Sequence, residues 1–287
     1  MRFVQFYDAD GHKRPGVLEG DRIRVIGTAT LLEYIALAPH ERIAWHTGDT
    51  IALAGTRLAA PVIPQRNVFC VGRNYLDHAK EGAAVFGKEM KLPDVPTFFT
   101  KAPSAIADPG VDLHLEAKVS SEYDYEAELG IVIARRCKNV SEADALGVIF
   151  GYTCVNDVTA RDLQRAHLQW FKGKSLDETC PIGPWIVAAE EFHQTDGSNR
   201  AQQLTISMKI NGAQKQLSNT EKMIFGIPRL IAELSKGMTL EPGDVIATGT
   251  PEGVGFARKP PEFLQNGDIM EIEIEGIGTL RNRISIG

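Results

Sequence analysis

The chain is best understood from residues 124–134, which are Asp124-Tyr-Glu-Ala-Glu-Leu-Gly-Ile-Val-Ile-Ala134. Successive side chains of a strand point to opposite faces, so a strand here places Glu126 and Glu128 on one face. The run over residues 130–134 continues apolar on both faces, which is typical of a strand that enters a core. Two adjacent carboxylates in such a setting are costly unless a proton or a cation lies between them, and a hard divalent ion is the usual solution. The stretch therefore predicts a buried strand with a candidate metal site beside it.

A second run of alternating glutamates, in the stretch MEIEIEG, has a simpler interpretation. Glu271, Glu273 and Glu275 alternate there with Met270, Ile272 and Ile274. The apolar residues form a clean face of their own, and glycine-rich turns close the strand. These acids are therefore predicted to lie on the solvated face of a sheet rather than at a site.

Short apolar stretches with strand periodicity dominate the chain from Asn67 onward. They are NVFCVG (67–72), TFFTKA (97–102), ELGIVIA (128–134), GVIFGYTCVN (147–156), GPWIVAA (183–189), LTISMKING (204–212), DVIATGT (244–250) and DIMEIEIEG (268–276). Helical patterns are few: one after Asn74, one after Thr159 and one over residues 219–237. The fold class predicted from this pattern is α+β, predominantly β.

The first part of the chain has a different pattern of predicted elements. It alternates short strand-like pieces with turns and contains one helix-like stretch over residues 29–46. Pro61 and Pro64 suit neither a helix interior nor a central strand. We therefore expect a small N-terminal β-rich domain over residues 1–64 and a larger domain over residues 65–287.

Composition excludes several classes of protein. The 287 residues are 43% hydrophobic, and 31 Lys and Arg stand against 37 Asp and Glu, which gives a net charge of -6 and argues against a nucleic-acid partner. No apolar run approaches the roughly 18 residues of a membrane helix, and the N-terminus lacks a signal-peptide pattern, so we expect a soluble protein of the cytoplasm or of an organelle matrix. The four cysteines show no CxxC spacing, which indicates neither a zinc cluster nor a disulfide framework.

A third candidate metal ligand, Asp157, follows the strand predicted over residues 147–156. Aspartate is also a favoured helix N-cap, but the sequence Thr-Ala-Arg-Asp over residues 159–162 approximates a capping box that leaves Asp157 free. The helix that follows places Arg161 and Gln164 on one face. Arginine near a metal suits a substrate carboxylate, because its planar fork matches two oxygens.

Further candidates lie in three other segments. His78 and Glu81 fall one turn apart on the helix predicted after Asn74, which is the arrangement of a general base oriented by a carboxylate or, alternatively, of a surface ion pair. Lys174 lies between Gly173 and Ser175 before a proline-rich turn. The glycine-rich segment over residues 248–255 follows a strand and would let backbone amides and Thr250 approach a ligand closely.

Six ordered motifs together resemble the fumarylacetoacetate hydrolase family over roughly residues 67–287. They are GRNYLDHAKE (72–81), FTKAPSA (99–105), DYEAELGIVI (124–133), GYTCVNDVTARDLQ (151–164), GKSLDETCPIGP (173–184) and GDVIATGTPEGVG (243–255). The resemblance implies a mixed β-roll or β-sandwich catalytic domain that forms a homodimer. It implies one Mg²⁺ or Mn²⁺ ion per subunit, a His-x-x-Glu dyad and a lysine for catalysis, and three residues that hold the substrate. The implied metal ligands are Glu126, Glu128 and Asp157, the catalytic residues His78, Glu81 and Lys174, and the substrate-binding residues Arg161, Gln164 and Thr250.

The resemblance also bears on the reaction. The segment CVGRNY lacks the acidic metal ligand that the larger animal fumarylacetoacetases have a few residues before the catalytic histidine, so the short acylpyruvase branch is the better comparison. We expect hydrolysis of a carbon–carbon bond in a 2,4-diketo acid, such as fumarylpyruvate or a diketo-deoxy sugar acid, to pyruvate and a carboxylic acid. The alternatives are an oxaloacetate decarboxylase and a 2-hydroxyhepta-2,4-diene-1,7-dioate-type isomerase. A protein that binds a metal and a small keto acid without turnover is the alternative of a different class.

Overall fold

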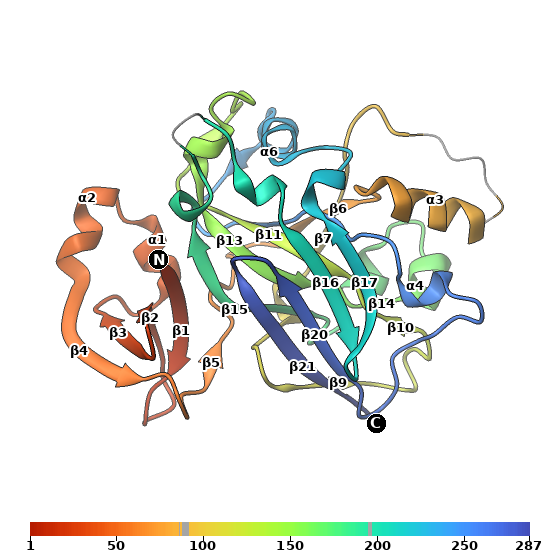
Figure 1. Cartoon of the computed structure of the whole chain (residues 1–287), viewed down its shortest axis with the longest axis horizontal. Coiled ribbons are helices and arrows are strands. Elements are labelled where there is room, and N and C mark those ends of the chain that lie inside the picture. The colour runs from red at the N-terminus through yellow and green to blue at the C-terminus, as the bar shows by residue number, and fades with distance from the viewer. Residues whose placement is uncertain (86, 88–91, 195–196) are drawn as a thin grey trace.

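Two β-sheets pack face to face in the computed structural model, which describes residues 1–85, 87, 92–194 and 197–287 (Figure 1). The larger sheet has twelve strands: β1 (Arg2–Tyr7), β2 (Lys13–Glu19), β3 (Arg22–Ile26), β4 (His46–Ala52), β5 (Leu58–Ala59), β6 (Val68–Gly72), β7 (Thr97–Lys101), β8 (Ile106–Ala107), β11 (Ala127–Ile133), β13 (Ile149–Asn156), β15 (Cys180–Ala188) and β19 (Val245–Ala247). Its order is β4-β3-β2-β1-β15-β13-β11-β19-β6-β7, with β5 beside β1 and β8 beside β15. The smaller sheet has the order β17-β16-β20-β21-β9 and is formed by β9 (Asp112–Leu115), β16 (Thr205–Ile210), β17 (Ala213–Asn219), β20 (Ile269–Ile274) and β21 (Gly278–Ile286).

Strand β11 is an interior strand of the larger sheet and is buried, as the sequence predicts. All seven of its residues are buried, because β13 and β19 pair with it on either side and both of its faces are covered. Leu129 and Ile131 belong to the apolar core between the two sheets. Val132, on the other face, packs with a second core to which the N-terminal strands contribute. A strand with two covered faces has the near-continuous apolar sequence observed here.

The smaller sheet is amphipathic and confirms the prediction for the MEIEIEG stretch. Met270, Ile272 and Ile274 of β20 are buried against the larger sheet, whereas Glu273 is exposed. Strand β21 was not predicted, because Asn282 interrupts its apolar alternation. Its side chain is nevertheless buried, and Nδ2 donates to the carbonyl oxygens of Asp108 and Val111, both at 2.9 Å.

The N-terminal strands continue the larger sheet rather than forming a separate one. Arg2 and Phe3 of β1 pair with Val187 and Ile186 of β15, and Figure 1 shows β1–β4 side by side at one edge of the molecule. The predicted division into residues 1–64 and 65–287 stays a prediction about folding units, since one sheet runs across it.

Six α-helices are found in the described part of the chain: α1 (Leu31–Ala36), α2 (Pro39–Arg42), α3 (Leu76–Val85), α4 (Arg161–Ala166), α5 (Phe171–Lys174) and α6 (Ile227–Ser235). The helix expected over residues 29–46 divides at Pro39, because a proline disfavours helical backbone in the residue before it. The helix expected over residues 219–237 is also shorter. Asn74 binds the backbone of Ile224 and Phe225, and α6 starts only after them, at Ile227.

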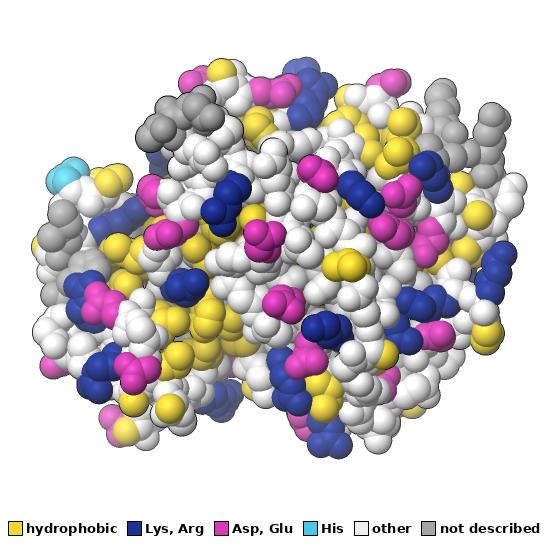
Figure 2. Space-filling model, viewed as in Figure 1, with side chains coloured by type: hydrophobic (Ala, Val, Ile, Leu, Met, Phe, Trp, Pro, Cys, Tyr) yellow, Lys and Arg dark blue, Asp and Glu magenta, His cyan; other side chains and the backbone are white. Residues whose placement is uncertain are grey.

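The remaining strands form two short ladders, β10 (Tyr123–Asp124) with β14 (Thr159–Ala160) and β12 (Cys137–Lys138) with β18 (Thr239–Leu240). The architecture confirms the predicted α+β, predominantly β class. None of the helices described here is long and apolar enough to cross a membrane. On the face shown in Figure 2, Lys and Arg lie interspersed with Asp and Glu, so neither sign of charge dominates that face.

Candidate active site

Three acidic side chains meet where β11 begins and β13 ends. Glu126 directly precedes β11, Glu128 is the second residue of β11, and Asp157 follows the last residue of β13. Ala127 pairs with Asn156 in antiparallel register, which brings these strand ends side by side. All three acids are buried, and each has an oxygen within 4.8 Å of an oxygen of the others. We refer to Glu126, Glu128 and Asp157 as the acid cluster.

Two buried lysines contact the acid cluster. Lys174 Nζ lies 2.8 Å from Glu126 Oε2 and 2.6 Å from Asp157 Oδ2. Lys101 Nζ lies 2.7 Å from the other oxygen of Asp157, and its side chain is fully buried. Lys101 Nζ also donates to the carbonyl oxygen of Val158 at 3.0 Å. Asp157 is therefore held between two ammonium groups.

Arg161 connects the acid cluster to a further acid, Asp124. Its Nη1 lies 2.7 Å from Glu126 Oε1, and its Nε lies 2.8 Å from Asp124 Oδ2. Nη1 also donates to Gln164 Oε1 at 3.1 Å, as expected for residues on one helix face. The remaining nitrogen, Nη2, is buried and has no hydrogen-bond partner among the residues described. A buried donor without a partner is costly, which suits a group that binds a ligand.

The pKa values of the two glutamates of the cluster are shifted in opposite directions. Burial opposes ionisation of Glu126, but the charges of Lys174, Arg161 and His78 outweigh it and lower the pKa of Glu126 to about 2. Burial, together with the negative charges of Asp157 and Glu126, holds the pKa of Glu128 well above its ordinary value. Gly249 N donates to Glu128 Oε2 at 2.8 Å, but this contact does not compensate for the two neighbouring acids. The two glutamates therefore differ: Glu126 is held as a carboxylate, whereas burial and two neighbouring acids oppose ionisation of Glu128.

His78 and Glu81 form a pair on α3. His78 Nδ1 lies 3.3 Å from Glu81 Oε2, and Gly253 N donates to the two oxygens of Glu81 at 3.0 and 3.2 Å. The carboxylate at Nδ1 favours the tautomer that carries its proton there, which leaves Nε2 as the basic nitrogen. Gly253, which binds Glu81, and Gly249, which binds Glu128, belong to one short segment, so the pair lies near the acid cluster.

The glycine-rich segment borders the same region. Gly249 and Gly253, whose amides bind Glu128 and Glu81, have φ angles of +97° and +100°, which only glycine adopts without strain. Thr250 is buried, and its hydroxyl accepts a hydrogen bond from Gln216 Nε2 at 2.8 Å. The segment thus reaches the acid cluster through its backbone, while the Thr250 hydroxyl is bound to Gln216.

The predicted capping box at residues 159–162 is wrong. Thr159 pairs with Asp124 in the β10–β14 ladder, and α4 starts after Ala160 without a side-chain cap. The extended ladder backbone keeps Thr159 outside the helix, and its hydroxyl donates to the carbonyl oxygen of Asp157. The carboxylate of Asp157 is nevertheless free for the two lysines, because it does not cap the helix either.

Sequence reasoning missed several side chains that build the site. Lys101 could have been found, because a lysine inside the otherwise apolar TFFTKA strand is unusual. Asp124 gave no local signal: its oxygens accept hydrogen bonds from Gly255 N at 2.7 Å and Phe256 N at 3.0 Å, far along the chain. Gln216 is similar, since its Oε1 accepts from Ala127 N at 3.0 Å.

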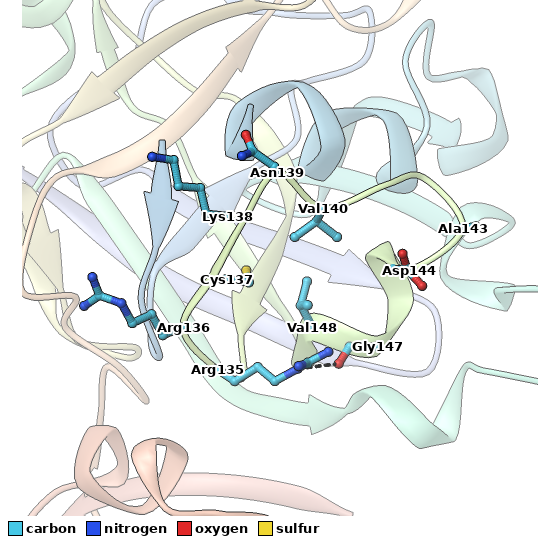
Figure 3. Close-up of a pocket in the computed structure, with 10 residues that line it drawn as sticks. All are labelled: Arg135, Arg136, Cys137, Lys138, Asn139, Val140, Ala143, Asp144, Gly147 and Val148. Carbon is cyan, nitrogen blue, oxygen red and sulfur yellow. Dashed lines mark hydrogen bonds between the residues drawn. The ribbon is translucent and has the colours of Figure 1, made fainter. Parts of the chain in front are cut away.

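A separate hollow of about 560 Å³ follows the opposite end of β11 and is lined by residues 135–140, 143–144 and 147–148 (Figure 3). Arg136 and Lys138 point away from Asp144, and Arg135 Nε donates to the carbonyl oxygen of Gly147 at 3.3 Å. Its polar groups do not converge on one point. The acid cluster is therefore the better candidate for chemistry.

The acid cluster fits a divalent metal ion. Carboxylate oxygens are the ligands that Mg²⁺ and Mn²⁺ prefer, and Glu126, Glu128 and Asp157 offer three within a small volume. Burial and the charges of Asp157 and Glu126 raise the pKa of Glu128, and a cation bound between these carboxylates would favour its ionised form.

Comparison with known proteins identifies the family. Residues 67–285 match the family model described as fumarylacetoacetate (FAA) hydrolase C-terminal. The chain belongs to the fumarylacetoacetate hydrolase family, which confirms the resemblance seen in its six motifs.

Relatives of this chain include proteins named for different activities. The chain is 42% identical over 269 residues to oxaloacetate tautomerase YisK of Bacillus subtilis, covering 93% of this chain and 84% of that protein. It is 37% identical over 293 residues to 2,4-didehydro-3-deoxy-L-rhamnonate hydrolase of Sphingomonas sp., covering 99% and 96%. The solved structure of fumarylacetoacetate hydrolase from Exiguobacterium antarcticum superposes with a TM-score of 0.83 at 39% identity, covering 100% of both chains. The family therefore includes both hydrolases and a tautomerase.

Proposed function

We propose that the chain is a divalent-metal-dependent hydrolase that cleaves a carbon–carbon bond of a 2,4-diketo acid to give pyruvate and a carboxylic acid. The observation that carries the proposal is the His78–Glu81 pair, which the glycine-rich segment connects to the acid cluster that Lys174 contacts. A base, a metal site and a buried ammonium group together are what addition of water to a ketone requires. The identity with a diketo-sugar-acid hydrolase over nearly the whole chain supports the same reaction class.

The acid cluster is proposed to hold a Mg²⁺ or Mn²⁺ ion. When bound, such an ion supplies Lewis acidity toward the keto and carboxylate oxygens of a 2-oxo acid. The three carboxylates keep their positions through the protein's own contacts, namely Gly249 N on Glu128, Arg161 on Glu126 and Lys101 on Asp157.

Substrate binding is assigned to the side chains that border the cluster. The unpartnered Nη2 of Arg161 is available for the substrate carboxylate. Gln164 Oε1 accepts a hydrogen bond from Nη1 and so helps to orient the guanidinium. The neighbouring backbone of the glycine-rich segment, with Thr250, is proposed to contact the keto oxygens. In this contact the Thr250 hydroxyl would donate to the substrate while it accepts from Gln216.

The bond changes follow from the positions of the protein groups. His78 Nε2 takes a proton from water, and Glu81 stabilises the imidazolium that results. The hydroxide adds to the carbonyl carbon distal to the carboxylate, and Lys174 stabilises the negative charge on its oxygen. The bond between that carbon and the neighbouring methylene carbon then breaks. The electron pair leaves with the pyruvate part, which takes up the proton from His78.

Turnover assays test the proposal. Purified protein is incubated with Mg²⁺ or Mn²⁺ and, separately, with acetylpyruvate, fumarylpyruvate and oxaloacetate, and pyruvate is measured through lactate dehydrogenase. We expect metal-dependent release of pyruvate from an acylpyruvate, abolished by a chelator. Reactions without protein correct for spontaneous breakdown of oxaloacetate. If no acylpyruvate is hydrolysed, the proposal is wrong.

A second candidate, action on oxaloacetate, is favoured by the identity with oxaloacetate tautomerase over 93% of this chain. Keto–enol exchange and decarboxylation of oxaloacetate need the same electrophilic centre but no water at His78. Metal-dependent loss of the enol absorbance, or release of pyruvate from oxaloacetate without acylpyruvate hydrolysis, would select this activity.

A further inference from the structure

The helix that carries Lys174 is too short to hold its own position. α5 contains four residues, and an isolated helix of that length is unstable in water. Phe171 at its start is 45% exposed and Leu168, shortly before it, is fully exposed, whereas Lys174 at its end is 2% exposed. Tertiary contacts must therefore determine where the ammonium group lies.

One such contact is Trp170, the residue before α5. Its indole lies directly over Gly72 at the end of β6: a Cβ added to Gly72 would come within 2.5 Å and 2.9 Å of two ring carbons. Phe99 meets the same ring edge-on at a centroid distance of 5.3 Å, and the guanidinium of Arg73 lies 5.6 Å from it. The missing side chain of Gly72 thus creates the space that Trp170 fills.

The other contact is Gly173, on the side that faces α4. A Cβ on Gly173 would lie 2.5 Å from Gln164 N and 2.9 Å from the carbonyl oxygen of Ala160. These are backbone atoms, which cannot move aside as a flexible side chain can. α5 is therefore enclosed between the backbone of α4 and the surface of β6 and β7.

Trp170 is connected to Lys174 through the backbone and through Phe99. Lys174 N donates to the carbonyl oxygen of Trp170 at 3.1 Å, and Lys174 Nζ lies 5.0 Å from the centroid of Phe99, the ring that Trp170 touches. We propose that Trp170 is a positioning residue that, packed on Gly72, holds Lys174 in contact with Glu126 and Asp157. The inference rests on the proposed function through the role given to Lys174. A displacement of about 1 Å in such a group can lower turnover by about 100-fold.

The test is a double-mutant cycle between Trp170→Ala and Lys174→Met. We expect Trp170→Ala to lower kcat by about 10- to 100-fold with little change in KM or in the Kd for Mn²⁺. In the Lys174→Met background the same change should lower kcat by less than about 3-fold, because the group that Trp170 positions is gone. Equal losses in both backgrounds would show that Trp170 acts independently of Lys174 and would overturn the inference.

A second pair of variants covers the case in which Trp170→Ala fails to fold. Gly72→Ala should lower kcat by pushing the indole away, and the double variant Gly72→Ala with Trp170→Phe should recover turnover because the smaller ring leaves room for the methyl group. Leu168→Ala, in the same exposed segment, is the matched control and should match wild type. Failure of the double variant to exceed Gly72→Ala would contradict the packing argument.

Oxalate binding separates this inference from the proposed function. Titration of the Mn²⁺-loaded protein with oxalate by calorimetry needs no turnover, so the cycle can be read even if no acylpyruvate is hydrolysed. Oxalate resembles the enolate of pyruvate that forms on bond cleavage rather than the bound substrate. We therefore expect Trp170→Ala and Lys174→Met each to weaken oxalate binding even where KM is unchanged, with less than additive effects. Absence of turnover with intact coupling would reject the proposed function alone, whereas normal turnover with additive effects would reject the inference alone.

Discussion

At the scale of single residues, Lys101 is a fully buried charge that the sequence analysis did not identify as part of the site. A fully buried lysine is rare unless it is paired, and Lys101 is paired with Asp157 at 2.7 Å. Loss of one partner of a buried ion pair leaves the other charge poorly compensated, and this costs about 3–5 kcal/mol. Because Asp157 would retain Lys174, we expect Lys101→Met to lower the free energy of unfolding by about 3 kcal/mol. Urea denaturation in the presence of a chelator measures the effect without a contribution from bound metal.

The matched control for Lys101→Met is Lys80→Met. Lys80 Nζ lies 3.0 Å from Asp77 Oδ1, but the two side chains are 55% and 41% exposed. Exposed pairs of this kind contribute about 0–1 kcal/mol. Similar changes in both variants would mean that burial does not strengthen the contact of Lys101 with Asp157.

Variants of two further residues distinguish the proposed metal site from the proposed base. Glu126→Ala removes a carboxylate of the acid cluster, so we expect loss of both turnover and Mn²⁺ binding. His78→Ala removes the proposed base, so hydrolysis should fall by about 100-fold or more while Mn²⁺ binding is retained. Mn²⁺ titration followed by electron paramagnetic resonance, alongside the pyruvate assay, measures both properties. A His78→Ala protein that no longer retains Mn²⁺ would contradict the division of roles.

At the scale of elements, the pairing of β13 with β15 requires glycine at one position. Gly151 of β13 pairs with Ala188 of β15, and a Cβ on Gly151 would lie 2.3 Å from the carbonyl oxygen of Val187. Backbone cannot yield there without separating β13 from β15. We expect Gly151→Ala to lower the free energy of unfolding by about 2 kcal/mol, as overpacking of a core typically does. Gly147→Ala is the control, because its nearest contact is 3.9 Å away, and thermal unfolding compares the two variants; equal melting temperatures would refute the packing argument.

The elements that the sequence predicts well are those whose signal is local. The run over residues 130–133 is apolar on both faces because an apolar core covers each face of β11, and all eight predicted strands are found. β21 was missed because a buried Asn282 binds backbone carbonyls elsewhere, which no local pattern reveals. The spacing of Glu126 and Glu128 gave the acid cluster for the same local reason. The contacts of Asp124, Lys101 and Trp170 depend on segments far away in the chain, so only the fold shows them.

At the scale of the whole molecule, the N-terminal strands are joined to the rest by more than the sheet. Asp108, in the segment between β8 and β9, accepts a hydrogen bond from Tyr7 Oη at 2.7 Å and from Ala60 N at 2.8 Å. Lys13 Nζ lies 3.5 Å from the same carboxylate, which is 13% exposed. One partly buried carboxylate thus joins β1, β2 and residue 60 to the larger part of the chain.

This junction predicts how stability depends on pH. Burial tends to raise the pKa of Asp108, but the amide of Ala60, the hydroxyl of Tyr7 and the charge of Lys13 together lower it below its ordinary value. A group with a lowered pKa in the folded state stabilises the protein above its unfolded pKa of about 3.9, and this contribution is lost as the pH falls through the folded pKa. We therefore expect Asp108→Asn to lower the free energy of unfolding by about 2 kcal/mol at pH 7. The difference from wild type should shrink below about pH 4.

Urea denaturation of Asp108→Asn and wild type between pH 3 and pH 7 measures this dependence. Asp10→Asn, which changes an exposed acid in the same N-terminal region, is the control and should leave stability nearly unchanged at every pH. Because Asp108 bridges the N-terminal strands to the other part of the sheet, its loss should also expose residues 1–60 first, as faster amide exchange in β1 and β2 than in β11. A constant stability difference across the pH range would show that the charge of Asp108 is not what holds the two parts together.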